Sequence, residues 1–425
     1  MLIQFTVGNF LSFKDRVTLD MRTTALHELP ENVFKIQNDT ELFKSVAVYG
    51  ANASGKSNLI KAFSFFREFV IWSYRDIQGG EKIDVLNFVL NDNSKTQPSF
   101  FEIVINTNSN VYRYSFEVDK EKVVSEKLFL VLKTTEIELF TRDSNGYKIA
   151  DAFKEGTVDL QVKTKNNCLF MSVVAQFNGK ISNEIIECLR KFRVSSTVGY
   201  RGFYNRTISR LEDKDGPQLK QNVLDFISVA DNTKDFEIET RTEQKDDPNK
   251  PGLKEVIRKF VFFVHEVFND KKEPTGKVRF ELNYLESEGT RKMFSLSVPI
   301  IDAIKNGEVI IIDELENHLH PLMFKHIIKL FNSNSNNKAQ LIFATHNLTC
   351  MNNECFRRDQ IWFTEKNDFG ESSLFSLADI KTNDNKKVRN DARYSNDYLM
   401  GKYGAVPFIK EIDNLFKEKE NEQAK

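Results

Sequence analysis

The chain of 425 residues is too long for one small domain and suits a large α/β domain that carries an insertion. Its charges balance to a formal net charge of -1, which excludes the global positive field that marks many nucleic-acid binders. We expect no signal peptide, because the N-terminus has no basic region followed by an apolar core. We expect no membrane-spanning helix, because no apolar run reaches about 18 residues. The four cysteines form no C-x-x-C pair, so we expect a cytoplasmic protein with reduced thiols.

The pattern of the first 175 residues predicts one lobe, which contains several strands and the helix after residue 58. Residues 1–25 alternate between apolar and polar positions, which predicts two strands joined by a polar turn. The apolar run at 46–48 predicts a buried strand, and the apolar spacing from Leu59 onward predicts a helix. Between 80 and 175, β-branched and aromatic runs divided by polar turns predict an antiparallel meander, closed by the start of a helix at 168–174.

Residues 176–275 change in character and predict a mainly helical insertion. Polar helical patterns cover 184–192 and 218–229, and a very polar stretch with proline breakers at 241–252 predicts a loop. We expect the chain to leave the main sheet here and to return near Val278.

A basic segment lies within this insertion. Aromatic residues are interleaved with its cations, and no acid stands between them in the sequence. Such a segment could bind a nucleic acid through its phosphates and stacked bases, or it could be a solvated face or a protein contact. The cations are Arg190, Lys191, Arg193, Arg201, Arg206 and Arg210.

Residues 276–410 predict a second α/β lobe. Residues 293–304 predict a helix, and the continuous apolar run at 309–312 predicts a central parallel strand that is buried on both faces. A helix is expected after Pro321, and residues 341–345 predict a strand that ends at His346. We expect 411–425 to form a charged C-terminal tail.

A P-loop pattern joins the strand at 46–48 to the helix that follows it. In this context the backbone N–H groups of the loop and the helix N-terminus bind phosphate oxygens. Lys56 is expected to reach the β- and γ-phosphates of ATP, and the Ser57 hydroxyl to hold Mg²⁺. An ordinary glycine turn between a strand and a helix is the alternative. The predicted nucleotide-binding residues of the loop are Gly50, Ala51, Asn52, Ala53, Ser54, Gly55, Lys56, Ser57 and Asn58.

Two acids and a histidine at strand ends predict the rest of the nucleotide site. Asp313 fits the acid that holds Mg²⁺, and Glu314 fits the base that orients the attacking water. His346, at the end of the next strand, can sense the γ-phosphate. With Lys56, Glu314 and His346 are the predicted catalytic residues, although an acidic corner and a structural histidine would produce the same local pattern.

The order of these motifs resembles a known class of ATPases. The P-loop, Ser287-Glu288-Gly289-Thr290, the strand ending in Asp313 and the strand ending in His346 occur in the order of ABC-type ATPases of the SMC/RecF/OLD branch. The opening segment 9–13 is similar to the start of those proteins. Residues 314–321, 357–366 and 401–407 resemble AAA ATPases of prokaryotic abortive-infection and anti-phage defence systems, of the AbiL, RloA and PARIS AriA kind.

The resemblance implies an ABC-type ATPase head with mixed parallel and antiparallel sheets. It also implies that Ser287 and Gly289, in the signature motif, contact the γ-phosphate of a nucleotide bound to a second copy of the chain. The protein would then be a homodimer that closes on ATP and Mg²⁺ and controls an effector encoded nearby, such as a TOPRIM-type nuclease. Glu288 replaces a glycine that is usual in this motif.

Three alternatives follow from the same motifs. A RecF- or SMC-like DNA-binding ATPase in repair or recombination would need the basic segment as its DNA surface. A self-contained OLD-type nuclease is disfavoured, because no Glu and Asp-x-Asp acid set follows His346. A metal site at Glu316, His318 and His320 is also disfavoured, because no further ligands cluster nearby in the sequence.

Overall fold

A computed structural model of the chain describes residues 1–36, 40–76, 80–107, 109–195, 201–228, 233–246, 253–381 and 385–406. The predicted tail at 411–425, the second half of the predicted polar loop (residues 247–252) and the end of the segment 401–407 lie outside these residues.

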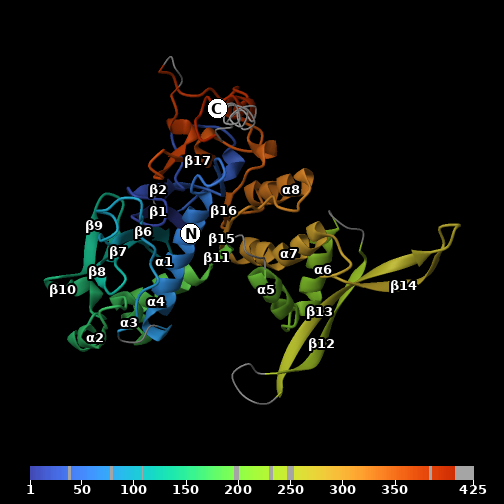
Figure 1. Cartoon of the computed structure of the whole chain (residues 1–425), viewed down its shortest axis with the longest axis horizontal. Coiled ribbons are helices and arrows are strands. Elements are labelled where there is room, and N and C mark those ends of the chain that lie inside the picture. Colours follow the sequence, from blue (N-terminus) through green and yellow to red (C-terminus); the bar gives the residue numbers. More distant parts are fainter. Residues whose placement is uncertain are drawn as a thin grey trace, which may run out of the picture.

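A seven-stranded antiparallel sheet forms one side of the molecule (Figure 1). Its strand order is β10-β9-β8-β7-β6-β1-β2, so the predicted N-terminal hairpin and meander are both confirmed. A small hairpin of β3 (Val33–Lys35) and β4 (Glu41–Phe43) follows β2. The strands of the large sheet are β1 (Leu2–Gly8), β2 (Val17–Asp20), β6 (Ser99–Asn106), β7 (Val111–Val118), β8 (Val123–Val131), β9 (Glu136–Asp143) and β10 (Gly146–Ile149).

A six-stranded sheet in the order β11-β15-β16-β5-β17-β18 lies at the centre of the molecule. All its pairs are parallel except β17 with β18, and β15 is paired on both sides, as its apolar run predicts. Its strands are β5 (Ser45–Tyr49), β11 (Phe192–Ser195), β15 (Val309–Ile312), β16 (Gln340–Ala344), β17 (Ile361–Lys366) and β18 (Ser372–Ser376).

Helices cover both faces of this central sheet. The long helix α1 runs between the two large sheets, while α7 and α8 pack on the opposite face of the central sheet (Figure 1). The helices are α1 (Lys56–Asp76), α2 (Val158–Lys163), α3 (Phe170–Gln176), α4 (Lys180–Arg190), α5 (Arg201–Leu211), α6 (Gly216–Ile227), α7 (Glu288–Asn306), α8 (Pro321–Asn332) and α9 (Tyr394–Leu399).

The central sheet separates two hydrophobic cores, because successive side chains of a strand point to opposite faces. Val46 and Val48 of β5 join the core that α1 shares with the antiparallel sheet, whereas Ala47 and Tyr49 join the core formed with α7 and α8. Aromatic rings fill much of the first core, and Phe66 of α1 stacks on Phe116 at 5.4 Å between ring centroids. The strands of the central sheet have no polar alternation because both of their faces are buried in a hydrophobic core.

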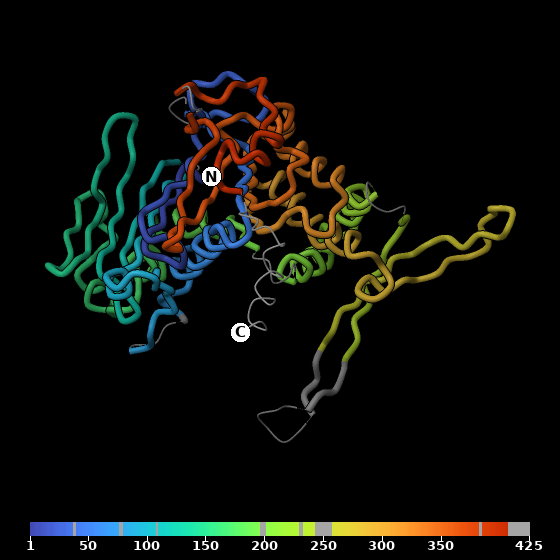
Figure 2. The backbone as a smooth tube through the Cα atoms, turned by 45° about the horizontal axis from the view of Figure 1, so that its top comes forward, coloured from blue at the N-terminus to red at the C-terminus, as the bar shows by residue number. Residues whose placement is uncertain are grey.

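The span predicted as a mainly helical insertion contains more strand than expected. Helices α4, α5 and α6 agree with the prediction, but residues 192–195 form β11 at the edge of the central sheet. The mainly helical prediction is wrong for residues 235–246 and 253–268, which form β12 (Asp235–Asp246) and β13 (Leu253–Phe268) of a three-stranded sheet with β14 (Pro274–Glu281). The loop predicted from residue 241 is likewise wrong for residues 241–246, which belong to β12. Figure 2 shows the strands of this sheet extending away from the rest of the chain.

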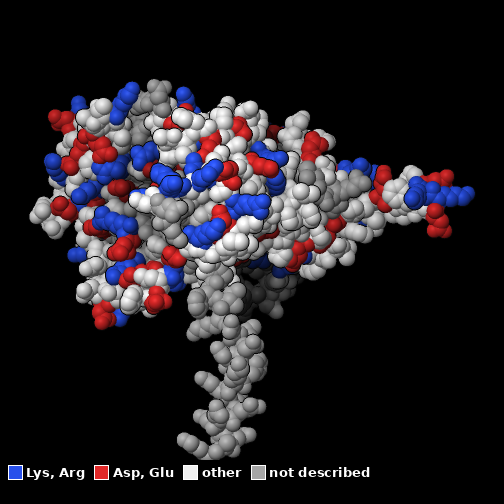
Figure 3. All heavy atoms as spheres, turned by 90° about the horizontal axis from the view of Figure 1, so that it is seen from above, with Lys and Arg blue, Asp and Glu red and all other residues white. Residues whose placement is uncertain are grey.

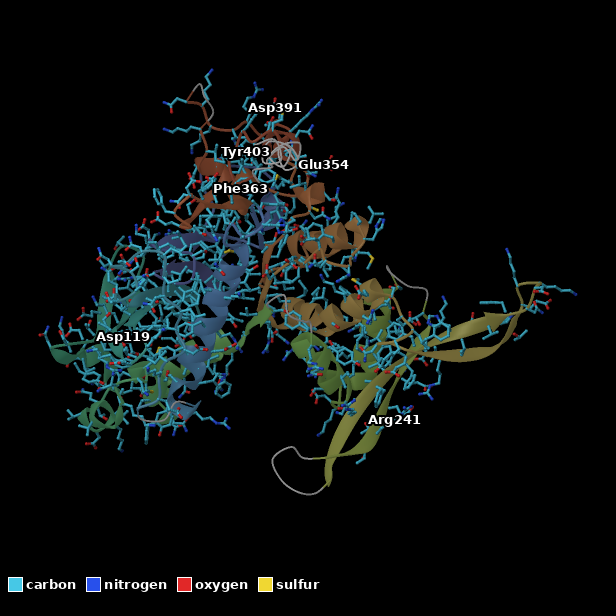
Figure 4. The ribbon with its side chains drawn as sticks, in the orientation of Figure 1. Asp119, Arg241, Glu354, Phe363, Asp391 and Tyr403 are labelled. Atoms are coloured by element: carbon cyan, nitrogen blue, oxygen red, sulfur yellow. The ribbon has the colours of Figure 1, made fainter. Side chains whose placement is uncertain are left out.

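Cation–π contacts explain why the polar strand β12 looked like a loop. The Arg241 guanidinium lies over the rings of Phe260 and Phe262 of β13, at 4.9 and 5.6 Å from their centroids. Arg241 stands on this extended sheet, away from both cores (Figure 4). A strand held by such contacts needs no alternation of apolar residues, so its pattern resembles that of a polar turn.

Candidate nucleotide-binding site

The carboxyl ends of three neighbouring parallel strands bring the predicted site together. In the ladder, Ile312 of β15 pairs with Phe343 of β16, and Ala344 of β16 pairs with Val48 of β5. The loops after these strands therefore start at the same edge of the sheet, where open α/β sheets bind their ligands. These loops carry the P-loop, Asp313 with Glu314, and His346.

The P-loop backbone takes conformations that require glycine at two positions. Gly50 and Gly55 have φ angles of +152° and +124°. A Cβ atom at Gly50 would lie 2.4 Å from the carbonyl oxygen of Thr364, and one at Gly55 would lie 2.6 Å from the Oγ of Ser372. Both the backbone angle and the close approach therefore exclude larger side chains.

Hydroxyl groups from distant segments support the loop from behind. Ser54 Oγ and Thr364 Oγ1 share a hydrogen bond of 2.6 Å, and Ser372 Oγ donates to Ser54 O at 2.7 Å. The side chain of Asn58, which is predicted to touch the nucleotide, donates to Ser12 Oγ at 2.7 Å. Ser12 and Thr364 lie in the segments 9–13 and 357–366 that carry the resemblance, whereas no sequence pattern marks Ser372.

Lys56 is the buried cation of the loop. Its side chain is 5% exposed, and its Nζ donates to the carbonyl oxygens of Gly50 and Ala51, each at 2.9 Å. Burial lowers the pKa of Lys56 to about 8, although Asp313, Glu316 and Glu314 oppose this change. A lysine held among loop carbonyls and facing three acids is suited to neutralising phosphate charge.

Asp313 has the surroundings expected of a metal-binding acid. It is 2% exposed, and neither of its carboxylate oxygens has a hydrogen-bond partner of normal geometry among the described residues. Burial raises the pKa of Asp313, and the nearby Ser57 hydroxyl and Lys56 partly offset this effect. A buried carboxylate without a partner beside a serine hydroxyl fits a divalent cation, so Ser57 and Asp313 are the residues that would hold Mg²⁺.

Glu314 and His346 lie on two loops that contact each other. Glu314 has a left-handed backbone with φ of +51°, and the Asn317 side chain donates to its carboxylate. The backbone N–H of His346 donates to the Glu316 carboxylate at 2.6 Å. Burial by neighbouring atoms and the Lys56 charge lower the pKa of His346, which favours a neutral imidazole.

The signature motif forms the first turn of α7. Ser287 is the N-cap residue, and its Oγ accepts a hydrogen bond from the Thr290 N–H at 3.1 Å. A Cβ atom at Gly289 would lie 2.9 Å from the carbonyl oxygen of His318. Glu288 contacts His318 Nδ1 at 2.5 Å, so the acid that replaces the usual glycine has a partner in its own chain.

The described residues contain no cluster of three His, Cys, Asp or Glu side chains with metal-site geometry. His320 instead caps the N-terminus of α8, where its Nδ1 accepts from the Leu322 N–H at 3.2 Å.

The basic segment is largely neutralised by acids that the fold supplies. Arg193 makes two hydrogen bonds to Glu308, at 2.9 and 2.8 Å. Arg206 and Arg210 both contact the buried Asp302 of α7. Arg190 pairs with Glu187, whereas Lys191 and Arg201 are exposed. The idea of an open basic surface on this segment is therefore wrong for most of its arginines, which hold elements together.

Cationic and anionic side chains alternate on the face seen in Figure 3. That face carries no broad area of one charge, which agrees with the balanced composition of the chain.

The segments 357–366 and 401–407 support the central sheet near the C-terminus. Arg357 is buried and donates to the Asp359 carboxylate and to the carbonyl oxygens of Leu26 and Glu28. The rings of Phe363 and Tyr403 lie 6.0 Å apart between centroids and are close together in Figure 4. The described parts of both segments are therefore packed as structural elements.

These strands, the P-loop, the acids and the signature helix define a P-loop NTPase head of the ABC type. Proteins of this class generally bind and hydrolyse nucleoside triphosphates with Mg²⁺. Residues 45–352 match the model of a family described as "AAA domain, putative AbiEii toxin, Type IV TA system". The chain belongs to this family.

Solved structures of SMC heads are distant likenesses. One is an SMC head bound to the C-winged helix domain of ScpA, with 13% identity, a TM-score of 0.46, and coverage of 88% of this chain and 97% of that chain. Another is the SMC head domain from Thermotoga maritima, with 13% identity, a TM-score of 0.39, and coverage of 88% and 98%. The fold assignment does not depend on them.

A comparison with curated proteins gives no match. Among the described helices, none is both long enough and apolar enough to cross a membrane.

Proposed function

We propose that this chain is a Mg²⁺-dependent ATPase that works as a dimeric switch. The observation that carries the proposal is the meeting of Lys56, Ser57 and Asp313 at one sheet edge, with an unpaired buried carboxylate on Asp313. In this proposal two copies close on two ATP molecules, and the signature residues Ser287 and Gly289 of each copy complete the site of the other.

Each of these residues has a separate proposed role in hydrolysis. The P-loop N–H groups and Lys56 bind the phosphates, and the positive N-terminus of α1 adds to their field. A bound Mg²⁺ ion would screen the phosphate charge between Ser57 and Asp313. Glu314 accepts a proton from the attacking water, and His346 contacts the γ-phosphate.

We further propose that closure controls an effector protein in anti-phage defence, such as a TOPRIM-type nuclease encoded nearby. The family description, which refers to a toxin and a type IV toxin–antitoxin system, supports this proposal. Co-purification of the chain with the products of adjacent reading frames tests this part; failure to retain any of them, with and without ATP, would count against it.

The central experiment is the substitution Glu314→Gln. We expect it to reduce ATP turnover at least a hundredfold while ATP is still bound, because it removes the proton acceptor and retains the size of the side chain. The variant should also accumulate as an ATP-bound dimer in size-exclusion chromatography with light scattering. Lys56→Ala, which should abolish ATP binding, is the matched negative control. Undiminished turnover in Glu314→Gln would refute the catalytic assignment.

A DNA-binding repair or recombination ATPase remains the alternative function. It has lost support, because Arg193, Arg206 and Arg210 form ion pairs within the chain.

A further inference from the structure

Lys292 is a buried lysine that has no part in the catalytic roles proposed above. Its side chain is 2% exposed and projects from the second turn of α7. The ammonium group donates to the carbonyl oxygen of Asn317 at 2.6 Å and to that of Glu314 at 3.1 Å. Burial lowers the pKa of Lys292 to about 7, although the nearby Glu316 and Glu314 carboxylates oppose this change. Burying a lysine is costly, and here two carbonyl oxygens accept hydrogen bonds from it.

The loop that Lys292 binds carries the proposed catalytic base. Glu314 and His318 both have left-handed backbone conformations, with φ of +51° and +61°. Such conformations cost energy for residues other than glycine and persist only where the surroundings hold them. The Asn317 side chain in turn donates to the Glu314 carboxylate. Lys292 therefore holds both the backbone of Glu314 and the residue that orients its side chain.

The same helix begins with the signature motif. Glu288, in the first turn of α7, contacts His318 Nδ1 at 2.5 Å, and the backbone of Gly289 approaches the His318 carbonyl oxygen so closely that a Cβ atom would not fit. Lys292, about one turn further along, contacts the other end of the loop at Glu314. The start of α7 therefore contacts both ends of the loop at 314–318, so the helix and the loop would move together.

We propose that Lys292 is a positioning residue for hydrolysis, which fixes the Glu314 loop to the signature helix. When the nucleotide of a second copy binds at the signature motif, α7 shifts, and Lys292 carries this shift to the loop that orients the Glu314 side chain. This inference rests on the proposed ATPase function and deepens it, since it couples dimer closure to the base in the same chain.

The test compares Lys292→Met with Lys292→Arg and with Lys305→Met, an exposed lysine near the end of the same helix. We expect Lys292→Met to lower kcat at least tenfold while the Kd for ATP, measured by titration calorimetry, changes less than twofold. Lys292→Arg should recover a large part of kcat, because a guanidinium can also donate to two carbonyl oxygens. Lys305→Met should match the wild type. If Lys292→Met does not fold, Lys292→Gln, which keeps one amide donor group, replaces it with the same expectations.

Two outcomes would overturn the inference. One is a kcat for Lys292→Met within twofold of the wild type. The other is a parallel loss of ATP binding and kcat in both Lys292→Met and Lys292→Arg, which would indicate general damage to the fold. The proposed function fails separately, if the wild-type dimer itself does not hydrolyse ATP.

Discussion

At the scale of single residues, burial shifts the pKa values of the charged groups in the candidate site. Lys56 and Asp313 are charged groups that the fold removes from water without pairing them directly. Their pKa values shift in opposite directions, since burial favours a neutral lysine and a neutral carboxyl group. Phosphate and a divalent cation would restore the charged forms of both, so ligand binding would relieve a cost that folding imposes.

Stability should therefore rise with pH through the Lys56 titration. The pKa of Lys56 is about 8 in the folded chain and 10.5 in the unfolded chain, so between these values the unfolded chain binds more protons. The free energy of unfolding then increases with pH, by at most about 3 kcal/mol from this group. Lys56→Met should remove this part of the rise in urea unfolding at pH 8 and 10. The exposed Lys61→Met, on the same helix, should keep it; identical slopes in the two variants would contradict the prediction.

The glycines of the P-loop provide a second test at this scale. Gly55→Ala places a Cβ atom 2.6 Å from Ser372 Oγ at a φ of +124°. We expect a loss of about 1–3 kcal/mol in the free energy of unfolding and at least tenfold weaker ATP binding. Gly202→Ala is the control, because nothing lies within 4 Å of the added atom. Equal effects of the two substitutions on thermal unfolding and ATP binding would refute the steric argument.

At the scale of elements, ion pairs join α5 to α7, and β11 to the residue before β15. Asp302 on α7 binds two arginines of α5, and Glu308 just before β15 binds Arg193 of β11. These acids are almost fully buried, so their arginines cannot leave without exposing an unpaired charge to a low dielectric. Three arginines of the segment that could have formed a ligand surface therefore connect α5 and β11 to the neighbouring elements.

Removing one acid should weaken this connection between elements. We expect Asp302→Asn to lower the free energy of unfolding by about 2 kcal/mol, because Arg206 and Arg210 lose a charged partner. Both arginines are about a quarter exposed, which keeps the cost below that of a fully buried pair. Asp213→Asn, at an exposed partner of Arg210, should change little in the same urea titrations. A comparable loss in both variants would show that the buried contact is not special.

At the scale of the whole molecule, the proposed dimer makes each site depend on two chains. In this proposal the P-loop and acids come from one copy, and Ser287 and Gly289 from the other. The N-terminus of α7 carries a partial positive charge that suits a γ-phosphate, and its N-cap serine leaves backbone N–H groups available there.

Mixing two inactive variants tests this arrangement directly. Lys56→Ala removes phosphate binding, and Ser287→Arg blocks the signature turn, so each variant alone should show almost no ATP turnover. A mixed dimer contains one complete site, formed by the P-loop of the Ser287→Arg chain and the signature of the Lys56→Ala chain. We therefore expect turnover to reappear on mixing, up to about a quarter of the wild-type rate for random pairing. If Ser287 served its own P-loop, mixing would restore nothing.

Local patterns were enough to predict much of the fold and the strand ends on which the candidate site residues lie. The P-loop lies between a strand and a helix as predicted, and Asp313 and His346 end neighbouring strands of one sheet. Hydrophobic alternation likewise identified the N-terminal hairpin and the meander. These features depend on residues that are near each other in the sequence, where spacing alone carries the information.

Contacts between distant residues decided the rest. Thr364 and Ser372 support a loop more than 300 positions away, and Arg193 meets Glu308 across 115 positions. No local pattern marks Lys292, whose contacts with the carbonyl oxygens of Glu314 and Asn317 arise only from the fold. The motifs indicate which residues are candidates for nucleotide binding, because the chemistry of a motif depends on near neighbours in the chain. Which charges are paired and which are buried could be read only from the folded chain, because these properties depend on partners that folding brings together.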